Sequence, residues 1–243
     1  SRDIEATLDC VVALGASFEK IQESETLYTI KIKGCGGKTK GEGLFPCFES
    51  GSTLRFLMPI SLVSGGSAVF TGTARLMQRG VGIYEELFRQ KGIDVNVTES
   101  GIHLKGTLPG GDYTLRGDVS SQYVTGLLFS LPLAKADSVI TVLPPVESRP
   151  YIDITLEVLK NTGIDIDERE PNVFYIKGGQ SYNPLNSYVP GDWSNAAALL
   201  AFNLIPGNRV YLSGLNTADS QGDKACVGFL KRIAQGDENP IDI

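Results

Sequence analysis

Apolar positions along this chain recur with the period of helices in some stretches and with the period of strands in others. Ile152, Leu156 and Leu159 are spaced i, i+4 and i+7, and this spacing predicts a helix. Residues 124–131 carry a second apolar stripe of helical period, in Val124, Leu127, Leu128 and Leu131. Residues 27–33 alternate polar and apolar side chains, which predicts a half-buried strand. Helices and strands therefore alternate along one chain.

The same sequence of elements recurs at a constant interval. Each predicted helix of one type stops at a glycine, namely Gly15, Gly92 or Gly163, and glycine is favoured just after a helix. Two predicted strands follow each stop, and the second runs into a Lys-Gly pair. The glycines of these pairs are Gly34, Gly106 and Gly178, each 72 residues from the next. This interval predicts an internal structural repeat.

We interpret the chain as an α/β protein built from repeated βαβαββ units. The expected repeats span approximately residues 1–72, 73–144 and 145–216, followed by a segment 217–243. Units of this size can place their helices inward and their sheets outward around a pseudo-threefold axis, giving one lobe. A repeat alone fits a duplicated protein of any purpose, so the function must be inferred from particular sites.

Composition narrows the function. The formal net charge is −6, which argues against nucleic acids and anionic membranes as partners. The four cysteines form no CxxC pair and His103 is the single histidine, so we expect no metal site. Scattered cysteines suit a reducing compartment, and the sequence has neither a leader pattern nor an apolar run long enough to span a bilayer. We therefore expect a cytoplasmic protein.

Two candidate anion sites lie where hydroxyl residues open a helix. Ser120, Ser121 and Gln122 precede the stripe at 124–131, and a helix N-terminus with two hydroxyls and an amide can bind an anion. Ser148 and Tyr151 flank a proline at the start of the next helix. From these residues alone, N-capping by a serine is the simpler interpretation in both cases.

Two arginines mark further candidates. Gly51 and Ser52 open a predicted helix that carries Arg55 one turn in, so an anion there would meet backbone N–H groups and a forked guanidinium. Arg79 is expected as a second cation at the start of the helix that stops at Gly92. Taken singly, an exposed arginine on a solvated face explains each. Together, four helix starts with anion-binding residues predict a ligand with more than one acidic group, and no acid–base pair accompanies them.

At these residues the sequence resembles the EPSP synthase (3-phosphoshikimate 1-carboxyvinyltransferase) family, along its whole length. Residues 49–55, Glu-Ser-Gly-Ser-Thr-Leu-Arg, are similar to the family's Asn-Ala-Gly-Thr-x-x-Arg motif, and Arg79 matches its Arg-Pro motif. Residues 118–122 resemble the shikimate 3-phosphate motif, the most specific of the set. Residues 148–155 and 220–223 resemble two further signatures.

The resemblance implies an inside-out α/β barrel lobe and transfer of the carboxyvinyl group of phosphoenolpyruvate to the 5-hydroxyl of shikimate 3-phosphate. Shikimate 3-phosphate would be bound by Ser120, Ser121, Gln122, Ser148 and Tyr151. Phosphoenolpyruvate would be bound by Gly51, Ser52, Arg55 and Arg79. The resemblance implies no cofactor, no metal and no macromolecular partner, and we expect a monomer.

The family's catalytic aspartate, lysine and glutamate have no counterpart here, so we expect no catalytic residue in this chain. The abrupt start at Ser1 and the strand-like Asp242-Ile243 suggest a fragment that is inactive alone. Glu49-Ser50 replaces Asn-Ala and adds a carboxylate near an anionic substrate, and Gly80 replaces proline, which loosens a turn.

Two alternatives remain open. A UDP-N-acetylglucosamine enolpyruvyl transferase would share the fold and the donor, but that branch lacks the Ser-Ser-Gln motif and carries a loop cysteine that this chain does not have after Arg79. A non-catalytic anion-binding module built on the same repeat is the second alternative.

Overall fold

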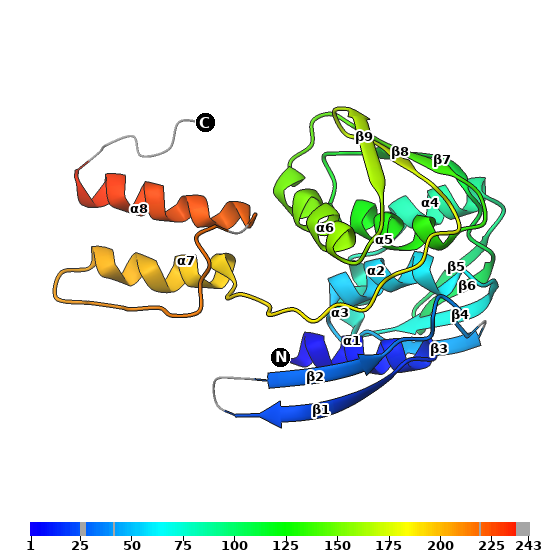
Figure 1. The fold of residues 1–243 in the computed structure, drawn as a ribbon, viewed down its shortest axis with the longest axis horizontal. Helices are drawn as coiled ribbons and strands as arrows, with labels where there is room; N and C mark the ends of the chain where they lie inside the picture. Colours follow the sequence, from blue (N-terminus) through cyan, green and yellow to red (C-terminus); the bar gives the residue numbers. More distant parts are fainter. Residues whose placement is uncertain (25–27, 41, 219, 237–243) are drawn as a thin grey trace. The chain divides into compact units, whose positions relative to one another are not determined.

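The computed structural model describes residues 1–24, 28–40, 42–218 and 220–236 of the chain (Figure 1). Leu27, at the start of the predicted strand, and Asp242-Ile243 lie outside the described residues. The chain divides into two compact units, which are described separately. The first comprises Ser1–Ser148 and Thr155–Pro184, and the second comprises Arg149–Ile154 and Leu185–Ile243.

The first unit contains two four-stranded sheets with the same topology. One sheet has the order β3-β4-β6-β5 and the other β7-β8-β10-β9. In each sheet the first pair of strands is parallel and the other pairs are antiparallel. The strands are β3 (Glu42–Pro46), β4 (Gly66–Thr71), β5 (Asp94–Thr98), β6 (Gly101–Gly106), β7 (Gly111–Arg116), β8 (Ser138–Leu143), β9 (Ile166–Glu170) and β10 (Val173–Ile176).

Helices connect these strands in the same order in both sheets. The first sheet uses α2 (Gly51–Ser61) and α4 (Gly82–Gln90), and the second uses α5 (Gln122–Ser130) and α6 (Arg149–Asn161). Two runs of βαβαββ result, as predicted. The runs begin with a strand, at Glu42 and at Gly111, a phase that the glycine spacing did not reveal. The boundaries 1–72, 73–144, 145–216 and 217–243 remain predictions.

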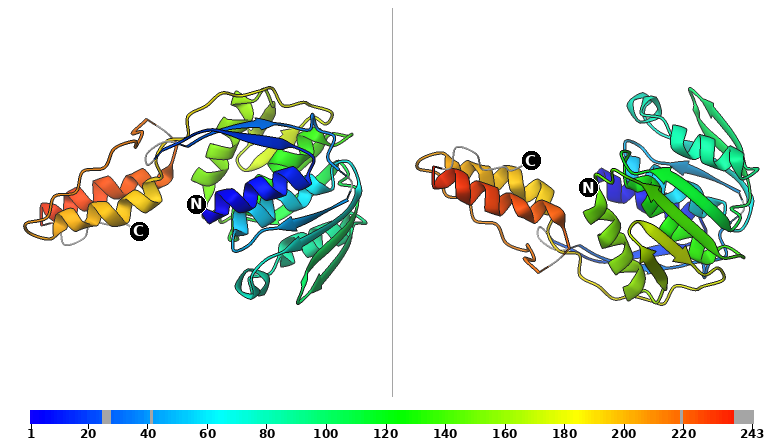
Figure 2. Two further views of the ribbon diagram at one scale, coloured as in Figure 1. Left: turned by 90° about the horizontal axis from the view of Figure 1, so that it is seen from below. Right: turned by 90° about the horizontal axis from the view of Figure 1, so that it is seen from above.

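A third copy of the helix–strand–strand segment precedes the first sheet. Helix α1 (Arg2–Ala13) leads into the antiparallel hairpin of β1 (Ser17–Glu23) and β2 (Tyr28–Lys33), drawn in blue in Figure 2. The helices α1, α4 and α6 all stop as predicted. The glycine after each has a positive φ, 108° at Gly15, 73° at Gly92 and 83° at Gly163, which side chains with a Cβ rarely adopt.

Helices α2 and α5, which occupy equivalent positions in the two runs, lie side by side in the interior of the first unit (Figures 1 and 2). Nearly every residue of both is buried, which explains why their sequences are apolar on more than one face. Their close approach depends on Gly126, because a Cβ there would lie 2.4 Å from the Arg55 carbonyl oxygen. The N-termini of these two helices carry the candidate site.

The second unit contains α7 (Trp193–Ala201) and α8 (Cys226–Ala234) together with the first turn of α6. Asp192 caps α7 by accepting a hydrogen bond from the Ser194 N–H. Trp193 fixes the neighbouring loop, because its Nε1–H donates to the Asn216 carbonyl at 3.0 Å. Among the described residues of the chain, no helix combines the length and apolar character that crossing a bilayer requires.

Candidate functional site

The N-terminus of α2 is held by a chain of hydroxyl groups. Ser50 is the N-cap, and its Oγ accepts a hydrogen bond from the Thr53 N–H at 3.2 Å and from the Thr53 hydroxyl at 2.7 Å. Thr53 in turn lies 2.7 Å from the hydroxyl of Thr7 in α1, while Ser52 lies 3.2 Å from Ser50. The first turn of α2 is therefore capped by the Ser50 side chain.

Two guanidinium groups converge on the first residue of α2. A Cβ built on Gly51 would lie 2.9 Å from Nη1 of Arg55 and 3.1 Å from Nη1 of Arg79. The glycine thus leaves room for both cations beside the positive end of the helix. Within the described part of the chain, neither arginine forms an ion pair with a carboxylate. Two unpaired cations at a helix N-terminus create a strong preference for an anion.

Arg55 is held in the interior. Its residue is 4% exposed, and its Nη1 donates to Oε1 of Gln122 at 2.7 Å. Its Nε is fully enclosed and has no hydrogen-bond partner within the described residues. A buried, uncompensated guanidinium is costly to the fold, because the charge loses water without gaining a carboxylate. A bound anion would supply that missing compensation.

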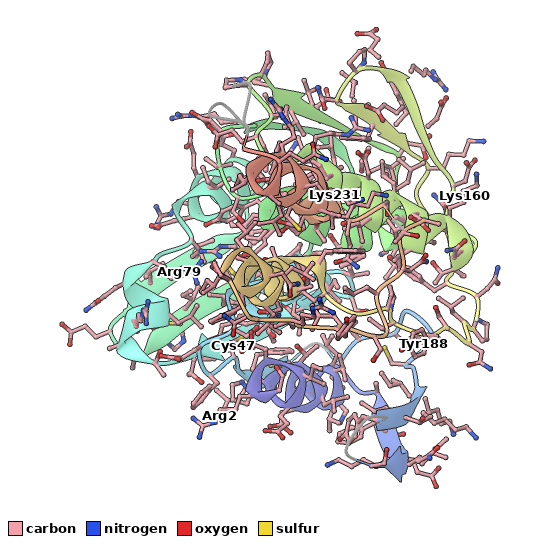
Figure 3. The ribbon with its side chains drawn as sticks, turned by 90° about the vertical axis from the view of Figure 1, so that its left-hand side faces the viewer. Arg2, Cys47, Arg79, Lys160, Tyr188 and Lys231 are labelled. Atoms are coloured by element: carbon pink, nitrogen blue, oxygen red, sulfur yellow. The ribbon has the colours of Figure 1, made fainter. Side chains whose placement is uncertain are left out.

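Arg79 occupies a different place from the one predicted. It is the C-cap of a short helix, α3 (Ala74–Gln78), and does not open α4, which begins at Gly82. The α3 helix forms because the Thr73 hydroxyl accepts from the Leu76 N–H at 3.4 Å, and it ends because Gly80 adopts a φ of 67°. Arg79, labelled in Figure 3, is exposed and can reach a ligand from outside α2.

A pocket of about 170 Å³ adjoins Arg79. It is lined by Glu49, Arg75, Leu76 and Arg79. Glu49 lines the pocket together with Arg75 and Arg79. Its carboxylate also accepts a hydrogen bond from the Thr73 hydroxyl at 3.4 Å. Glu49 was expected to add a carboxylate near the anion site, and it does. Arg75 was missed by the sequence analysis, although its position four residues before Arg79 was the available signal.

The serine hydroxyls at the start of α5 contribute little to capping the helix. Ser121 is the N-cap, but its side chain makes no capping hydrogen bond. Ser120 accepts from the Gln122 N–H only at 3.4 Å. The carboxylate of nearby Asp118 is bound by the guanidinium of Arg116, which also lowers the pKa of Asp118. The capping interpretation therefore fails at Ser121, and its hydroxyl can bind a ligand.

The loop that carries Ser148 is bonded to the segment that leads into α5. The Glu147 N–H donates to the Gly117 carbonyl at 3.2 Å, which joins the two segments that carry Ser148 and Ser120. Ser148 is the N-cap of α6 and likewise makes no side-chain capping bond.

Tyr151 belongs to the second unit, where its hydroxyl donates to Oδ2 of Asp223 at 2.8 Å. That hydrogen bond is the main cause of a raised pKa of Tyr151, and burial and the charges of Asp223 and Asp192 add to it.

The structure thus brings most of the predicted residues together and adds others. Gly51, Arg55 and Arg79 meet at α2, and Gln122 joins Arg55 to the serines of α5. The sequence analysis missed Tyr123, whose ring lies under Arg55, because only the packing of α5 on α2 reveals that contact. Within the described residues, no three His, Cys, Asp or Glu side chains are grouped as a metal site would require.

Comparison with known proteins identifies close relatives. A family model described as EPSP synthase (3-phosphoshikimate 1-carboxyvinyltransferase) matches residues 1–238. The chain is 38% identical to a 3-phosphoshikimate 1-carboxyvinyltransferase of Clostridium kluyveri, covering 100% of this chain and 57% of the relative. It is also 38% identical to the protein of that name from Clostridium botulinum strain Eklund 17B, covering 96% and 54%. The chain therefore spans just over half the length of these relatives.

Solved structures with similar folds agree with these matches. An EPSP synthase from Acinetobacter baumannii superposes with a TM-score of 0.64 at 24% identity, covering 81% of this chain and 44% of that one. The enolpyruvyl transferase NikO from Streptomyces tendae superposes with a TM-score of 0.53 at 13% identity, covering 81% and 46%. At these identities the likeness supports the fold, and it confirms the predicted α/β enolpyruvyl transferase type.

Proposed function

This chain belongs to the EPSP synthase family, and from that premise we propose that it supplies substrate-binding groups for transfer of an enolpyruvyl group from phosphoenolpyruvate to shikimate 3-phosphate. In that reaction the 5-hydroxyl group loses its proton and its oxygen bonds to C2 of phosphoenolpyruvate, while C3 gains a proton. Loss of phosphate and of a C3 proton then restores the double bond. We assign the residues of this chain to binding and orientation, with no proton-transfer role.

The observation that carries the proposal is the convergence of Arg55 and Arg79 on Gly51. Phosphoenolpyruvate carries a carboxylate and a phosphate, and both are groups that guanidinium forks and helix N-termini bind well. Because Arg55 is buried without a carboxylate partner in the described part of the chain, an anion there restores local neutrality. We place phosphoenolpyruvate against Gly51, Ser52, Arg55 and Arg79.

The acceptor is placed at the start of α5. The hydroxyls of Ser121 and Ser148 make no capping bonds, and Ser120 makes only a long one, so they can donate to a phosphate. Oε1 of Gln122 is occupied by Arg55, which turns its Nε2 donors toward other partners. Tyr151 is kept in the proposed acceptor set. To bind the ligand, its hydroxyl would have to break the hydrogen bond to Asp223 or contact Asp223 and the ligand together.

We further propose small-molecule substrates only, a cytoplasmic location and a monomer, with neither nucleic acid nor membrane as a partner. The acidic net charge of −6 supports the last of these proposals, because nucleic acids and anionic lipids attract basic surfaces. Size-exclusion chromatography with light scattering tests the oligomeric state. A dimer at micromolar concentration would refute the monomer.

Calorimetric titration of shikimate 3-phosphate into the chain is the first test. We expect a Kd between roughly 1 µM and 1 mM, corresponding to about −8 to −4 kcal/mol. Plain shikimate should bind at least tenfold more weakly, and the Ser121→Ala, Gln122→Ala double variant should lose the preference for the phosphate. Equal binding of shikimate and shikimate 3-phosphate would reject the acceptor assignment.

Turnover is tested in a chimera, because the chain spans just over half the length of its relatives. Residues 1–243 replace the matching part of the Clostridium kluyveri protein, and phosphate release is followed with both substrates. We expect release that requires shikimate 3-phosphate and falls at least 100-fold in Arg79→Ala, about 2.7 kcal/mol. Release that is independent of shikimate 3-phosphate would exclude the proposed transfer.

A further inference from the structure

Arg55 needs more than its hydrogen bond to Gln122 to stay in place. Its long side chain has several rotatable bonds, and among the described residues the one hydrogen bond that fixes it joins Nη1 to Gln122 at 2.7 Å. The Nε group has no partner in the described part of the chain. Unless something else orders the guanidinium, binding an anion would cost the entropy of fixing it. The structure offers an aromatic ring for this purpose.

The ring of Tyr123 lies against the Arg55 guanidinium. The Cζ atom of Arg55 is 5.1 Å from the ring centroid, within the range of a cation–π contact. Tyr123 is 6% exposed, so water screens the contact little. The residue directly follows Gln122, so one turn of α5 holds the guanidinium from two sides, by an amide oxygen and by an aromatic face.

Tyr123 is itself locked by Tyr84 of α4. The Tyr84 hydroxyl donates to the Tyr123 carbonyl oxygen at 2.7 Å, and the two rings meet edge to face at 4.8 Å and 84°. Tyr84 is 0% exposed and stacks on Phe88 at 4.8 Å. Burial raises the pKa of Tyr84 well above its ordinary value, so its hydroxyl keeps the proton that it donates.

Gly126 allows these groups to meet. A Cβ at this position would lie 2.3 Å from the Tyr84 hydroxyl oxygen and 2.4 Å from the Arg55 carbonyl oxygen. Both distances are impossible for a real carbon, so any side chain would separate α2, α4 and α5 at this point. The glycine, the two tyrosines and the arginine thus form one continuous contact from α4 through α5 to α2.

We propose that Tyr123 is a positioning residue that fixes the Arg55 guanidinium for the donor substrate, with Tyr84 fixing Tyr123. The inference rests on the proposed function of Arg55. Tyr123 is required to act through its ring face, because the contact is with the ring and not with the hydroxyl. This role predicts that removing the Tyr123 ring lowers the affinity for phosphoenolpyruvate, the ligand proposed for Arg55, and has little effect on the affinity for shikimate 3-phosphate.

The binding test compares Tyr123→Leu, Tyr123→Phe and the core control Phe174→Leu, which changes a fully buried ring of β10. Phosphoenolpyruvate is titrated in the presence of shikimate 3-phosphate, and shikimate 3-phosphate is titrated alone. We expect Tyr123→Leu to weaken phosphoenolpyruvate roughly tenfold and shikimate 3-phosphate by less than about threefold. Tyr123→Phe should retain most of the wild-type affinity for phosphoenolpyruvate, since it keeps the ring. Phe174→Leu should lower stability and leave both affinities within about twofold.

A double-mutant cycle tests whether Tyr123 acts through Arg55. In the Arg55→Ala background, Tyr123→Leu should cause no further loss of phosphoenolpyruvate affinity. A full tenfold loss in that background, or an equal loss in Tyr123→Phe, would overturn the positioning role. If the wild type binds shikimate 3-phosphate and phosphoenolpyruvate but Tyr123→Leu matches it, the inference is wrong while the proposed function stands.

Urea unfolding without ligand is measured for the wild type, Arg55→Ala, Tyr123→Leu and the double variant. It distinguishes failure of the positioning role from failure of the proposed function. We expect the effects of Arg55→Ala and Tyr123→Leu on the free energy of unfolding to be non-additive, because the side chains touch. Additive effects would overturn the contact itself. If the wild type binds neither substrate, the proposed function fails and the ligand role of Tyr123 fails with it, and non-additivity would then leave a purely structural contact.

Discussion

Nη1 of Arg55 donates a hydrogen bond to Oε1 of Gln122 at 2.7 Å, across the interface between α2 and α5. The two helices occupy equivalent positions in the two βαβαββ runs, so this bond joins the first turns of two repeats. It also sets the orientation of the Gln122 amide, because the oxygen must face the guanidinium. The donor subsite and the acceptor subsite of the proposed reaction therefore share one hydrogen bond.

Gly51→Ala should affect ligand binding far more than folding. The new methyl group would lie 2.9 Å and 3.1 Å from the two guanidiniums, whose flexible ends can move away from the anion site. We expect phosphoenolpyruvate affinity to fall roughly tenfold, with a change in the free energy of unfolding below about 1 kcal/mol.

Gly82→Ala is the matched control for that experiment. Gly82 is also the first residue of a helix, and a Cβ there would meet nothing within 4 Å. Calorimetry measures the phosphoenolpyruvate affinity of both variants, and urea unfolding measures their free energies of unfolding. Equal phosphoenolpyruvate affinity in the two variants would contradict the placement of the anion at Gly51.

Ser50→Ala should lower the stability of the protein more than Ser121→Ala does. The Ser50 hydroxyl caps α2, whereas Ser121 makes no capping bond. We expect Ser50→Ala to lower the free energy of unfolding by about 1 kcal/mol and Ser121→Ala by less than about 0.5 kcal/mol. Urea unfolding measures both, and a loss at Ser121 as large as that at Ser50 would return Ser121 to a capping role.

Gly80→Pro should destabilise the protein, even though the family's Arg-Pro motif has proline at the position after the arginine. Gly80 has a φ of 67°, which proline cannot adopt, and its N–H donates to the Met77 carbonyl at 3.0 Å. The glycine therefore ends α3, where the sequence suggested only a looser turn. We expect a loss exceeding about 1 kcal/mol in urea unfolding. An unchanged midpoint would show that the end of α3 tolerates another backbone conformation.

Tyr151 should titrate above the ordinary pKa of 10 for tyrosine. Its hydrogen bond to Asp223 and that carboxylate's charge both favour the protonated phenol. Since the pKa is higher in the folded state, the contribution of this interaction to stability is complete below pH 10. It is lost as the pH rises through the raised pKa.

Phenolate absorbance measures this titration. The difference between the wild type and Tyr151→Phe isolates the Tyr151 signal from the other eight of the nine tyrosines. Asp223→Asn should move the midpoint back toward 10. A midpoint that does not respond to Asp223→Asn would exclude the hydrogen bond as the cause.

Local signals in the sequence were reliable where one residue determines one geometry. The stops at Gly15, Gly92 and Gly163 were predictable because the left-handed backbone that ends each helix favours glycine. Arg55 and Gly51 could be placed together because both lie within one turn of the same helix.

Contacts between distant elements were not predictable from the sequence. Helix α3 has only five residues, too few to show a period, so Arg79 was placed at the wrong end of a helix. The partners Tyr151 and Asp223 are 72 residues apart. The contact of Tyr123 with Arg55 depends on how α5 packs against α2, which no pattern within either helix encodes.

The pairing of α2 with α5 has a consequence for how such a site can arise and be altered. Two copies of one unit begin with the same architecture, and each presents a helix start to its twin. Here one helix start carries a cation and the other a neutral amide with two alcohols, so in the proposed assignment each copy binds a different half of one ligand set. Neither copy can now stand in for the other, and exchanging them would give a lobe of unchanged architecture with its two specialised helix starts in the wrong places.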